Sequence, residues 1–351
     1  MKTLGVDLWG GQVRGASENR ATLMRPAAAP RIEREIRSLF HGAYAQFAAA
    51  CRAVDEPGIA MIAVDEATGR PAGCCTLRAR VARHVAAMVG RHDQCDLFLN
   101  GNDELALRHL AIILDPVKCW SKNSNVVKYR VLDLRTSNGF RDEQGRPLRG
   151  LKAEGPAVLR VGGYALFVMP LGDAADWPEN GNDAWDMIPP REYFDELTST
   201  PEASIKLPTQ RTSGLERSFA GARTHVSVIM RTAGPRDTGD SLVMPGSGVG
   251  SLELVGKSHR GTLTLGHSAL RDGVLIGRYA RCDGAGLLDD PSLSRVHALL
   301  LDVDDAFLVI DTASRNGTRI AGQASTRVIG ISGDMELGLG SRTRAFWRFC
   351  S

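Results

Sequence analysis

The sequence has little net charge and no long apolar run. Acidic and basic residues are intermixed along its 351 residues, and the formal net charge is only +3. A nucleic-acid-binding domain usually carries a clustered basic stripe, so this balance argues against a nucleic-acid partner. No stretch approaches the ~20 apolar residues of a membrane span, and residues 1–15 lack the apolar core of a secretion signal. We therefore expect a soluble, cytoplasmic protein that binds neither nucleic acid nor a membrane.

The sequence also lacks paired cysteine motifs. Its seven cysteines form no C-x-x-C pair and no spaced set of cysteine and histidine metal ligands. They are Cys51, Cys74, Cys75, Cys95, Cys119, Cys282 and Cys350. Scattered thiols of this kind are typical of a reducing compartment, where disulfides are rare. We expect no metal site, no disulfide framework and no cofactor.

Three short motifs near the C-terminus each lie where an apolar strand pattern ends. They are Gly277-Arg278 after the apolar run Val274 to Ile276, then Ser294-Arg295-Val296-His297, then Arg315-Asn316-Gly317-Thr318. All three are expected on loops, and loops gathered at one end of a β-sandwich converge on a single surface. The motifs therefore predict one shared site.

The residue types in these motifs favour an anion. Arg278 offers a planar fork of donors suited to bidentate capture of phosphate, Ser294 adds a hydroxyl donor, and the turns add backbone N–H groups. A phosphorylated side chain carries about two negative charges and three strong acceptor oxygens. It therefore matches such a cluster better than a carboxylate does.

The combined Gly-Arg, Ser-x-x-His and Asn-Gly pattern resembles the forkhead-associated (FHA) domain, a class of phospho-motif reader. The resemblance implies a β-sandwich whose loops bind a phosphothreonine peptide. It implies that Arg278 and Ser294 bind the phosphate, and that Asn316 contacts the peptide backbone beside the phosphothreonine. Arg295 and Arg315 on the same loops are further candidates for contact with the phosphate or with acidic peptide residues.

Other residues of these motifs are expected to support the loops. By resemblance His297 braces its loop from inside, and Gly277 and Gly317 belong to the same support. Asn-Gly between two apolar runs is also a tight hairpin signal. Ser294 and His297 could instead be a nucleophile and its base, but their three-residue spacing points the side chains differently and no third residue orients the histidine. We therefore predict that the protein is not an enzyme.

The motifs recur in the N-terminal half at nearly constant spacing. Gly90-Arg91 precedes Gly277-Arg278 by 187 residues, His109 precedes His297 by 188, and Asn138 precedes Asn316 by 178. Such spacing indicates an internal duplication, with residues 118–128 inserted as a longer hairpin in the first copy.

The first copy has lost part of the site. Ala106 stands where the second copy has Ser294 and Leu107 where it has Arg295, while Arg91, His109 and Asn138 remain. A missing charge-assisted hydrogen bond of ~1.5 to 3 kcal/mol weakens phosphate binding by an order of magnitude or more. The first copy is therefore expected to be a degenerate site with a mainly structural role.

The chain is long enough for two domains of ordinary size. We predict a mainly β protein with two FHA-like antiparallel sandwiches, a degenerate one at residues 58–172 and an FHA domain at residues 250–351. Residues 1–57 are expected to form a leader and an amphipathic helix from Arg31 to Val54. Residues 173–249 form a Pro/Ser/Thr/Gly-rich linker with a short helix at Arg191 to Leu197 and a strand at His225 to Arg231.

Two hypotheses for function follow. The first is a phosphothreonine-peptide-binding adaptor in Ser/Thr kinase signalling, whose partners are threonine-phosphorylated proteins. Ser/Thr protein kinases are candidate partners, and so is the chain's own linker through Thr198 or Thr200. The alternative is a structural or oligomerisation protein built of two sandwiches that bind no phosphate.

Overall fold

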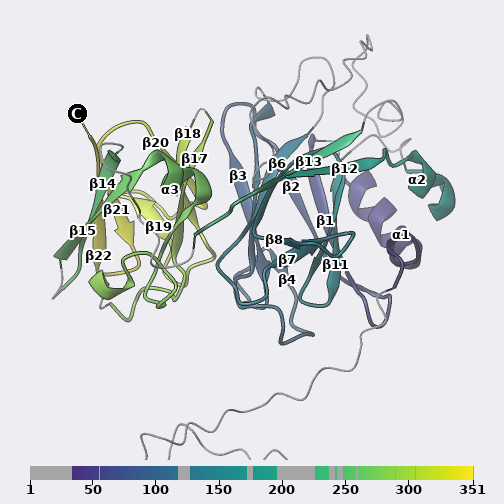
Figure 1. The fold of residues 1–351 in the computed structure, drawn as a ribbon, viewed down its shortest axis with the longest axis horizontal. Helices are drawn as coiled ribbons and strands as arrows, with labels where there is room; N and C mark the ends of the chain where they lie inside the picture. Colours follow the sequence, from purple (N-terminus) through teal and green to yellow (C-terminus); the bar gives the residue numbers. More distant parts are fainter. Residues whose placement is uncertain are drawn as a thin grey trace, which may run out of the picture. The chain divides into compact units, whose positions relative to one another are not determined.

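Two β-sandwiches account for most of the protein, as Figure 1 shows. The computed structural model describes residues 34–54, 56–117, 127–171, 177–195, 226–236, 242, 248–257, 260–288, 290–304 and 306–350. Residues Arg34–Ser351 form one compact unit. The predicted mainly β fold with an N-terminal helix is confirmed.

The first sandwich consists of thirteen strands in two sheets. They are β1 (Gly58–Asp65), β2 (Pro71–Arg78), β3 (Val85–Gly90), β4 (Leu97–Phe98), β5 (Leu110–Leu114), β6 (Lys128–Asp133), β7 (Phe140–Asp142), β8 (Pro147–Leu148), β9 (Gly150–Glu154), β10 (Ala157–Val161), β11 (Tyr164–Pro170), β12 (Arg191–Asp195) and β13 (Ser227–Thr232). One sheet has the order β2-β1-β11-β10-β7-β8 and the other β12-β13-β9-β6-β5-β3-β4.

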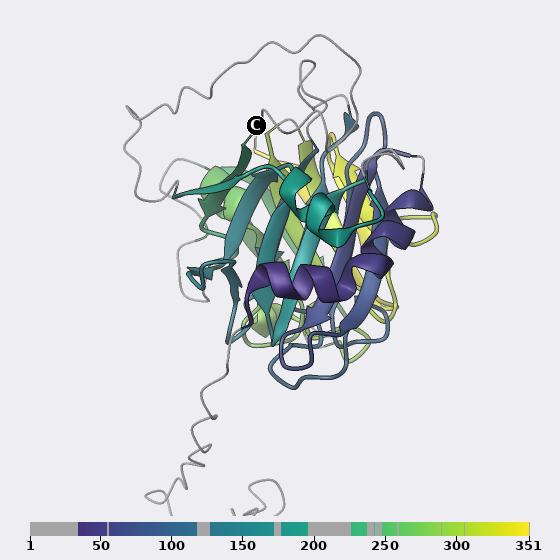
Figure 2. The same ribbon diagram turned by 90° about the vertical axis from the view of Figure 1, so that its right-hand side faces the viewer.

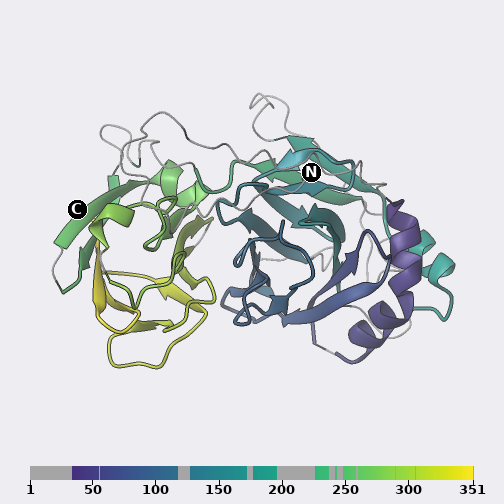
Figure 3. The same cartoon turned by 90° about the horizontal axis from the view of Figure 1, so that it is seen from below.

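Strand β1 is buried on both faces. Ile59 and Met61 face the core between the two sheets, whereas Ala60 and Ile62 face the helix α1 (Ile36–Arg52). This explains why β1 is almost continuously apolar and does not alternate with polar residues. Figure 2 shows α1 lying across the sheet, and Figure 3 shows α1 and α2 (Gly181–Met187) on the same side of the first sandwich.

Part of the expected linker completes the first sandwich. The predicted helix at Arg191 to Leu197 is wrong, because Arg191–Asp195 forms β12 and pairs in parallel with β13. The predicted strand near His225 is β13, which pairs with β9 at the sheet edge. A segment of five residues forms no stable helix by itself, so the backbone pairing offered by β13 decides its structure.

The second sandwich consists of nine strands and a short helix. They are β14 (Gly248–Val255), β15 (Arg260–Gly266), α3 (His267–Asp272), β16 (Val274–Ile276), β17 (Ala298–Val303), β18 (Ala306–Asp311), β19 (Thr318–Ile320), β20 (Val328–Ile331), β21 (Met335–Leu339) and β22 (Thr343–Phe349). Its sheets have the orders β15-β14-β22-β21-β19 and β16-β17-β18-β20. Trp347, which is fully buried, is the largest side chain of the core between them.

The strand order of the second sandwich repeats that of the first. The order β2-β1-β11-β10-β7 corresponds strand for strand to β15-β14-β22-β21-β19, and β9-β6-β5-β3 corresponds to β20-β18-β17-β16. The predicted internal repeat therefore has a structural counterpart in the pairing of the strands.

A separate apolar cluster joins the two sandwiches. It contains residues of β3, β5 and β6 in the first sandwich and of β16, β17 and β18 in the second. Its buried members are Ala86, Met88, Cys95, Ala111, Ile113, Leu132, Leu134, Leu275, Cys282, Leu299, Leu301, Val303, Leu308, Ile310 and Ala313. These strands are thus covered by their own core on one face and by the other sandwich on the opposite face.

Polar contacts across this interface occur as matching pairs. Arg135 and Ala313 occupy the same position in the two copies, and both have positive φ, 55° and 59°. The carbonyl oxygen of Ala313 accepts hydrogen bonds from Nε and Nη2 of Arg108 at 3.0 and 2.6 Å. The carbonyl oxygen of Arg135 accepts one from Nη1 of Arg281 at 2.8 Å.

Two ion pairs across the interface use aspartates at the same position of the two copies, Asp283 and Asp96. Arg135 pairs with Asp283 at 2.6 Å, and Arg327 pairs with Asp96 at 3.3 Å. Each aspartate also accepts a backbone N–H from its own sandwich. The first pair is buried, with side chains 3% and 7% exposed, whereas the second is 29% and 32% exposed.

The buried pair gives a test of the interface. Arg135→Ala leaves the Asp283 carboxylate buried without its cation, so we expect the free energy of unfolding to fall by about 3 to 5 kcal/mol. Arg78→Ala at the exposed pair with Glu56, whose two side chains are each 51% exposed, is the control, with an expected loss of about 1 kcal/mol or less. Denaturant unfolding monitored by fluorescence measures both. Equal losses in the two variants would contradict this account.

Candidate functional site

Arg278 lies directly after β16 with an exposed side chain. Its Nε donates to the carbonyl oxygen of Leu293 at 2.9 Å, which joins the loop after β16 to the loop before β17. In the described part of the chain this is the only hydrogen bond of the Arg278 side chain. The two terminal nitrogens of the guanidinium are therefore available to a ligand.

The loop between β18 and β19 joins the same site. The Arg315 N–H donates to Oγ of Ser294 at 2.9 Å, and Nδ2 of Asn316 donates to the carbonyl oxygen of Ser292 at 2.7 Å. Because the Ser294 oxygen acts here as an acceptor, its own O–H remains able to donate to an anion. The structure thus brings Arg278, Ser294 and Asn316 together on three connected loops.

His297 is fully buried beneath these loops. Its Nδ1 accepts a hydrogen bond from the Ser294 N–H at 3.1 Å, and its Nε2 lies 3.2 Å from the carbonyl oxygen of Gly317. An accepting Nδ1 and a donating Nε2 define a neutral imidazole. Burial lowers the pKa of His297, which keeps this neutral form.

Both glycines of the site are required by the backbone. A Cβ at Gly277 would lie 2.3 Å from the carbonyl oxygen of Arg295. Gly317 has φ +73°, and a Cβ there would lie 2.3 Å from Oγ of Ser325. Any larger residue would therefore displace one of the loops.

The charges of the site are not neutralised by the protein. No ion pair between described residues involves Arg278, Arg295 or Arg315. Arg278 and Arg315 lie on the connected loops, whereas the Arg295 side chain lines a pocket between the two sandwiches. The site is consequently cationic, although its three arginines do not all converge.

A buried carboxylate that the sequence analysis missed holds the third loop. Oδ2 of Asp311 accepts from the hydroxyls of Ser314 at 2.5 Å and Thr318 at 2.9 Å, and its Oδ1 accepts from the Ser314 N–H. In the first copy Asp133 accepts from Thr136 in the same way. The pattern Asp-x-x-Ser/Thr precedes Asn-Gly in both copies. This repeated pattern could have predicted that the aspartate holds the loop.

The first copy keeps the support of the loops but lacks the serine hydroxyl, because Ala106 stands at the position of Ser294. Ala106 N–H donates to Nδ1 of His109 at 3.0 Å, and Nε2 of His109 lies 2.7 Å from the carbonyl oxygen of Gly139. Asn138 donates to the carbonyl oxygen of Glu104 at 3.3 Å, as Asn316 does to that of Ser292. The loops are therefore connected as in the second copy.

The charge of Arg91 is neutralised within the first copy. Its Nε donates to the carbonyl oxygen of Leu105 at 2.7 Å, but its Nη1 pairs with Asp103 at 3.1 Å. The corresponding position in the second copy is Pro291. Sequence reasoning missed Asp103, because nothing in the motif requires an acid there. An anion approaching Arg91 would meet this carboxylate.

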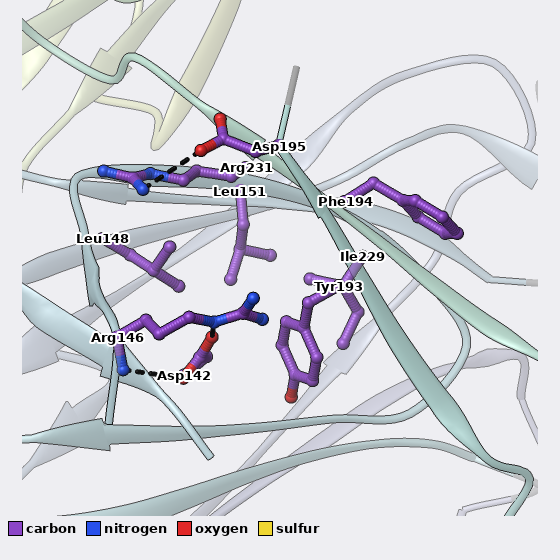
Figure 4. Close-up of a pocket in the computed structure, with 9 residues that line it drawn as sticks. All are labelled: Asp142, Arg146, Leu148, Leu151, Tyr193, Phe194, Asp195, Ile229 and Arg231. Atoms are coloured by element: carbon purple, nitrogen blue, oxygen red, sulfur yellow. Dashed lines mark hydrogen bonds and ion pairs between the residues drawn. The ribbon is translucent and has the colours of Figure 1, made fainter. Parts of the chain in front are cut away.

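A further pocket, shown in Figure 4, lies between β9, β12 and β13. Its volume is about 80 Å³, well below that of most small-molecule sites. Arg146 pairs with Asp142 at 2.6 Å and Arg231 with Asp195 at 3.2 Å. These internal pairs leave the pocket without an uncompensated charge.

Among the described residues, no group of three or more His, Cys, Asp or Glu residues could hold a metal ion. None of the described helices is long and apolar enough to cross a membrane.

Comparison with known proteins identifies a domain in the second sandwich. The family model described as FHA domain matches residues 274–340, and this segment contains all the loops joined at Arg278, Ser294 and Asn316. Residues 274–340 are therefore an FHA domain. The matched segment lies wholly within the second sandwich, and no curated protein matches the chain.

Several solved structures are also similar to part of this chain. The FHA-1 domain of Mycobacterium tuberculosis Rv1747 is 21% identical, with 29% of this chain and 99% of that chain covered and a TM-score of 0.24. EmbR of the same organism, in complex with a low-affinity phosphopeptide, is 17% identical over 29% of this chain and 25% of that chain, with a TM-score of 0.24. The yeast Dun1 FHA domain, in complex with a doubly phosphorylated peptide, is 22% identical. The match covers 32% of this chain and 83% of that chain, with a TM-score of 0.24.

The buried imidazole gives a prediction on pH. Since burial lowers the pKa of His297 in the folded chain, the unfolded chain binds a proton first as the pH falls below about 6.5. The free energy of unfolding should therefore decrease between pH 7 and pH 5. His297→Gln is less stable at pH 7 but should show a shallower decrease, measured by denaturant titration at each pH. An unchanged slope in this variant would contradict the role given to His297.

Proposed function

We propose that the protein is a phosphothreonine-peptide-binding adaptor in Ser/Thr kinase signalling and that it binds through the second sandwich. The observation that carries this proposal is the convergence of Arg278, Ser294 and Asn316 on three connected loops without a neutralising carboxylate. The FHA domain match at residues 274–340 supports it, because it covers all three residues.

Each residue has a separate role in the proposed complex. The terminal nitrogens of Arg278 and the hydroxyl of Ser294 bind the phosphate, which offers three strong acceptor oxygens. Asn316 exchanges its bond to Ser292 for one to the peptide backbone, and Arg315 contacts the phosphate or an acidic peptide residue. Contact with the threonine methyl group adds about 0.8 kcal/mol over phosphoserine.

The proposed partners are threonine-phosphorylated proteins, among them Ser/Thr protein kinases. The proposed place of binding is the cytoplasm. The chain's own linker is a further candidate. Its threonines Thr198 and Thr200 lie outside the described residues, so this candidate stands on sequence alone. A tethered phosphothreonine would have an effective concentration of roughly millimolar and would compete with free peptides.

A binding role rather than a catalytic one is supported by the hydrogen bonds of His297. Both ring nitrogens are engaged by backbone groups, and neither bonds the Ser294 hydroxyl. A nucleophilic serine needs a base within hydrogen-bond reach of its oxygen. Here the serine oxygen contacts the Arg315 N–H instead.

The oligomerisation alternative is disfavoured by the interface inside the chain. The apolar faces of β3, β5 and β6 and of β16, β17 and β18 would be the natural surfaces for self-association, but they cover each other. The first sandwich is instead proposed to be a structural platform for the second. Its site has Ala106 in place of the phosphate-binding serine and Asp103 beside Arg91.

The proposal is tested by calorimetric titration of the full chain with a phosphothreonine peptide. Arg278→Ala removes the charge-assisted hydrogen bonds to phosphate, worth about 1.5 to 3 kcal/mol, so affinity should fall about 10- to 100-fold. Arg91→Ala, the corresponding change in the first sandwich, is the matched control and should leave binding unchanged. The unphosphorylated peptide should not bind. Equal affinity of Arg278→Ala and the unmodified chain would refute the assignment.

A further inference from the structure

A second cationic pocket, of about 260 Å³, lies between the two sandwiches. It is bounded by the loops of the first sandwich that form the degenerate site and, in the second sandwich, by the loop after Arg278 and by Arg295 and Val296 of the loop before β17. Its lining includes Leu107, Arg108, Tyr279, Arg281 and Arg295. The pocket therefore exists only because both sandwiches are present.

Arginine dominates the charge of this pocket. Five arginines line it, and no Asp or Glu is found among its described lining residues. Two of the five are neutralised by carboxylates from outside the pocket, Arg91 by Asp103 and Arg135 by Asp283. The other three, Arg108, Arg281 and Arg295, form no ion pair with any described residue. Three positive charges consequently surround a small cavity without a carboxylate paired to any of them among the described residues.

Two of these guanidiniums are held in place by the protein. Arg108 is nearly buried and donates twice to the carbonyl oxygen of Ala313. Arg281 donates to the carbonyl oxygen of Arg135 and lies over the Tyr279 ring at 5.2 Å from its centroid. Since a carbonyl satisfies donors but does not cancel charge, each group keeps its attraction for an anion.

The pocket also has an apolar part. Leu107 and Tyr279 are among the few large hydrophobic side chains that are exposed in the described chain, at 36% and 40%. Both line the pocket beside the arginines. An anion alone would leave these side chains in water, whereas an anion attached to an apolar or aromatic group would cover them.

From this combination we infer that the pocket between the sandwiches binds a phosphate monoester attached to an apolar or aromatic group. Guanidinium forks suit the three equivalent oxygens and about two negative charges of the phosphate. The pocket volume admits one small ester or one phosphorylated side chain. The inference does not depend on the phosphothreonine site, since it involves neither Arg278 nor Ser294.

The test uses the full chain carrying Arg278→Ala, so that the proposed phosphothreonine site is disabled. Calorimetric titration with phenyl phosphate is expected to show one site. Adding Arg281→Ala or Arg295→Ala should weaken binding at least ten-fold. Arg348→Ala on β22, an exposed arginine outside both sites, should leave it unchanged. Arg295 forms no side-chain hydrogen bond with a described residue, so its removal tests the pocket even if Arg281→Ala disturbs the interface.

Two further ligands distinguish the source of the phosphate. A short phosphotyrosine peptide that binds more tightly than phenyl phosphate would indicate a phosphorylated partner protein. Binding of phenyl phosphate without the peptide would indicate a free phosphate ester. Either result supports the inferred pocket. It is overturned if phenyl phosphate fails to bind the Arg278→Ala chain, or if binding there is unaffected by both Arg281→Ala and Arg295→Ala.

Discussion

The proposed binding site depends on one buried imidazole. His297 accepts the Ser294 N–H on one side and meets the Gly317 carbonyl on the other, so a single neutral ring sets the spacing of two loops. His109 makes the same two contacts in the first sandwich. The ring therefore maintains the shape of the loops whether or not their tips carry phosphate donors. The support of the loops is therefore separate from the phosphate-binding chemistry, since the first sandwich has the same histidine contacts with Ala106 in place of Ser294.

The interface gives a physical reason for keeping the first sandwich. Strands β5 and β17 are apolar on both faces, so either sandwich alone would expose a sheet face to water. Burying that face contributes favourable free energy only if the partner copy is present. Arginine contacts from both sandwiches cross this interface, among them the buried pair of Arg135 with Asp283 and the more exposed pair of Arg327 with Asp96.

Much of the candidate site could be predicted from the sequence because its requirements are local. Gly277 has no room for a side chain, Gly317 needs a positive φ, and His297 lies at a fixed spacing from Ser294. The strand β12, the ion pair of Arg91 with Asp103 and the position of Arg295 could not be predicted in this way. Each depends on what lies beside it in space rather than along the chain. The uninterrupted apolar runs at Leu110–Leu114 and Ala298–Leu301 indicate strands that are buried on both faces. They do not indicate that the other sandwich covers the second face, because an apolar run does not identify its neighbour.

The packing of the two sandwiches brings charged side chains from both to one pocket. In the first sandwich Asp103 cancels Arg91, yet the pocket over the same loops gains Arg281 and Arg295 from the second sandwich. The cations at this end of the first copy are thus supplied in part by its neighbour. Because Arg295 follows Ser294 directly, one loop contributes a hydroxyl to the FHA site and a guanidinium to the pocket. The two positions therefore share a single backbone segment, although each uses a different side chain of it.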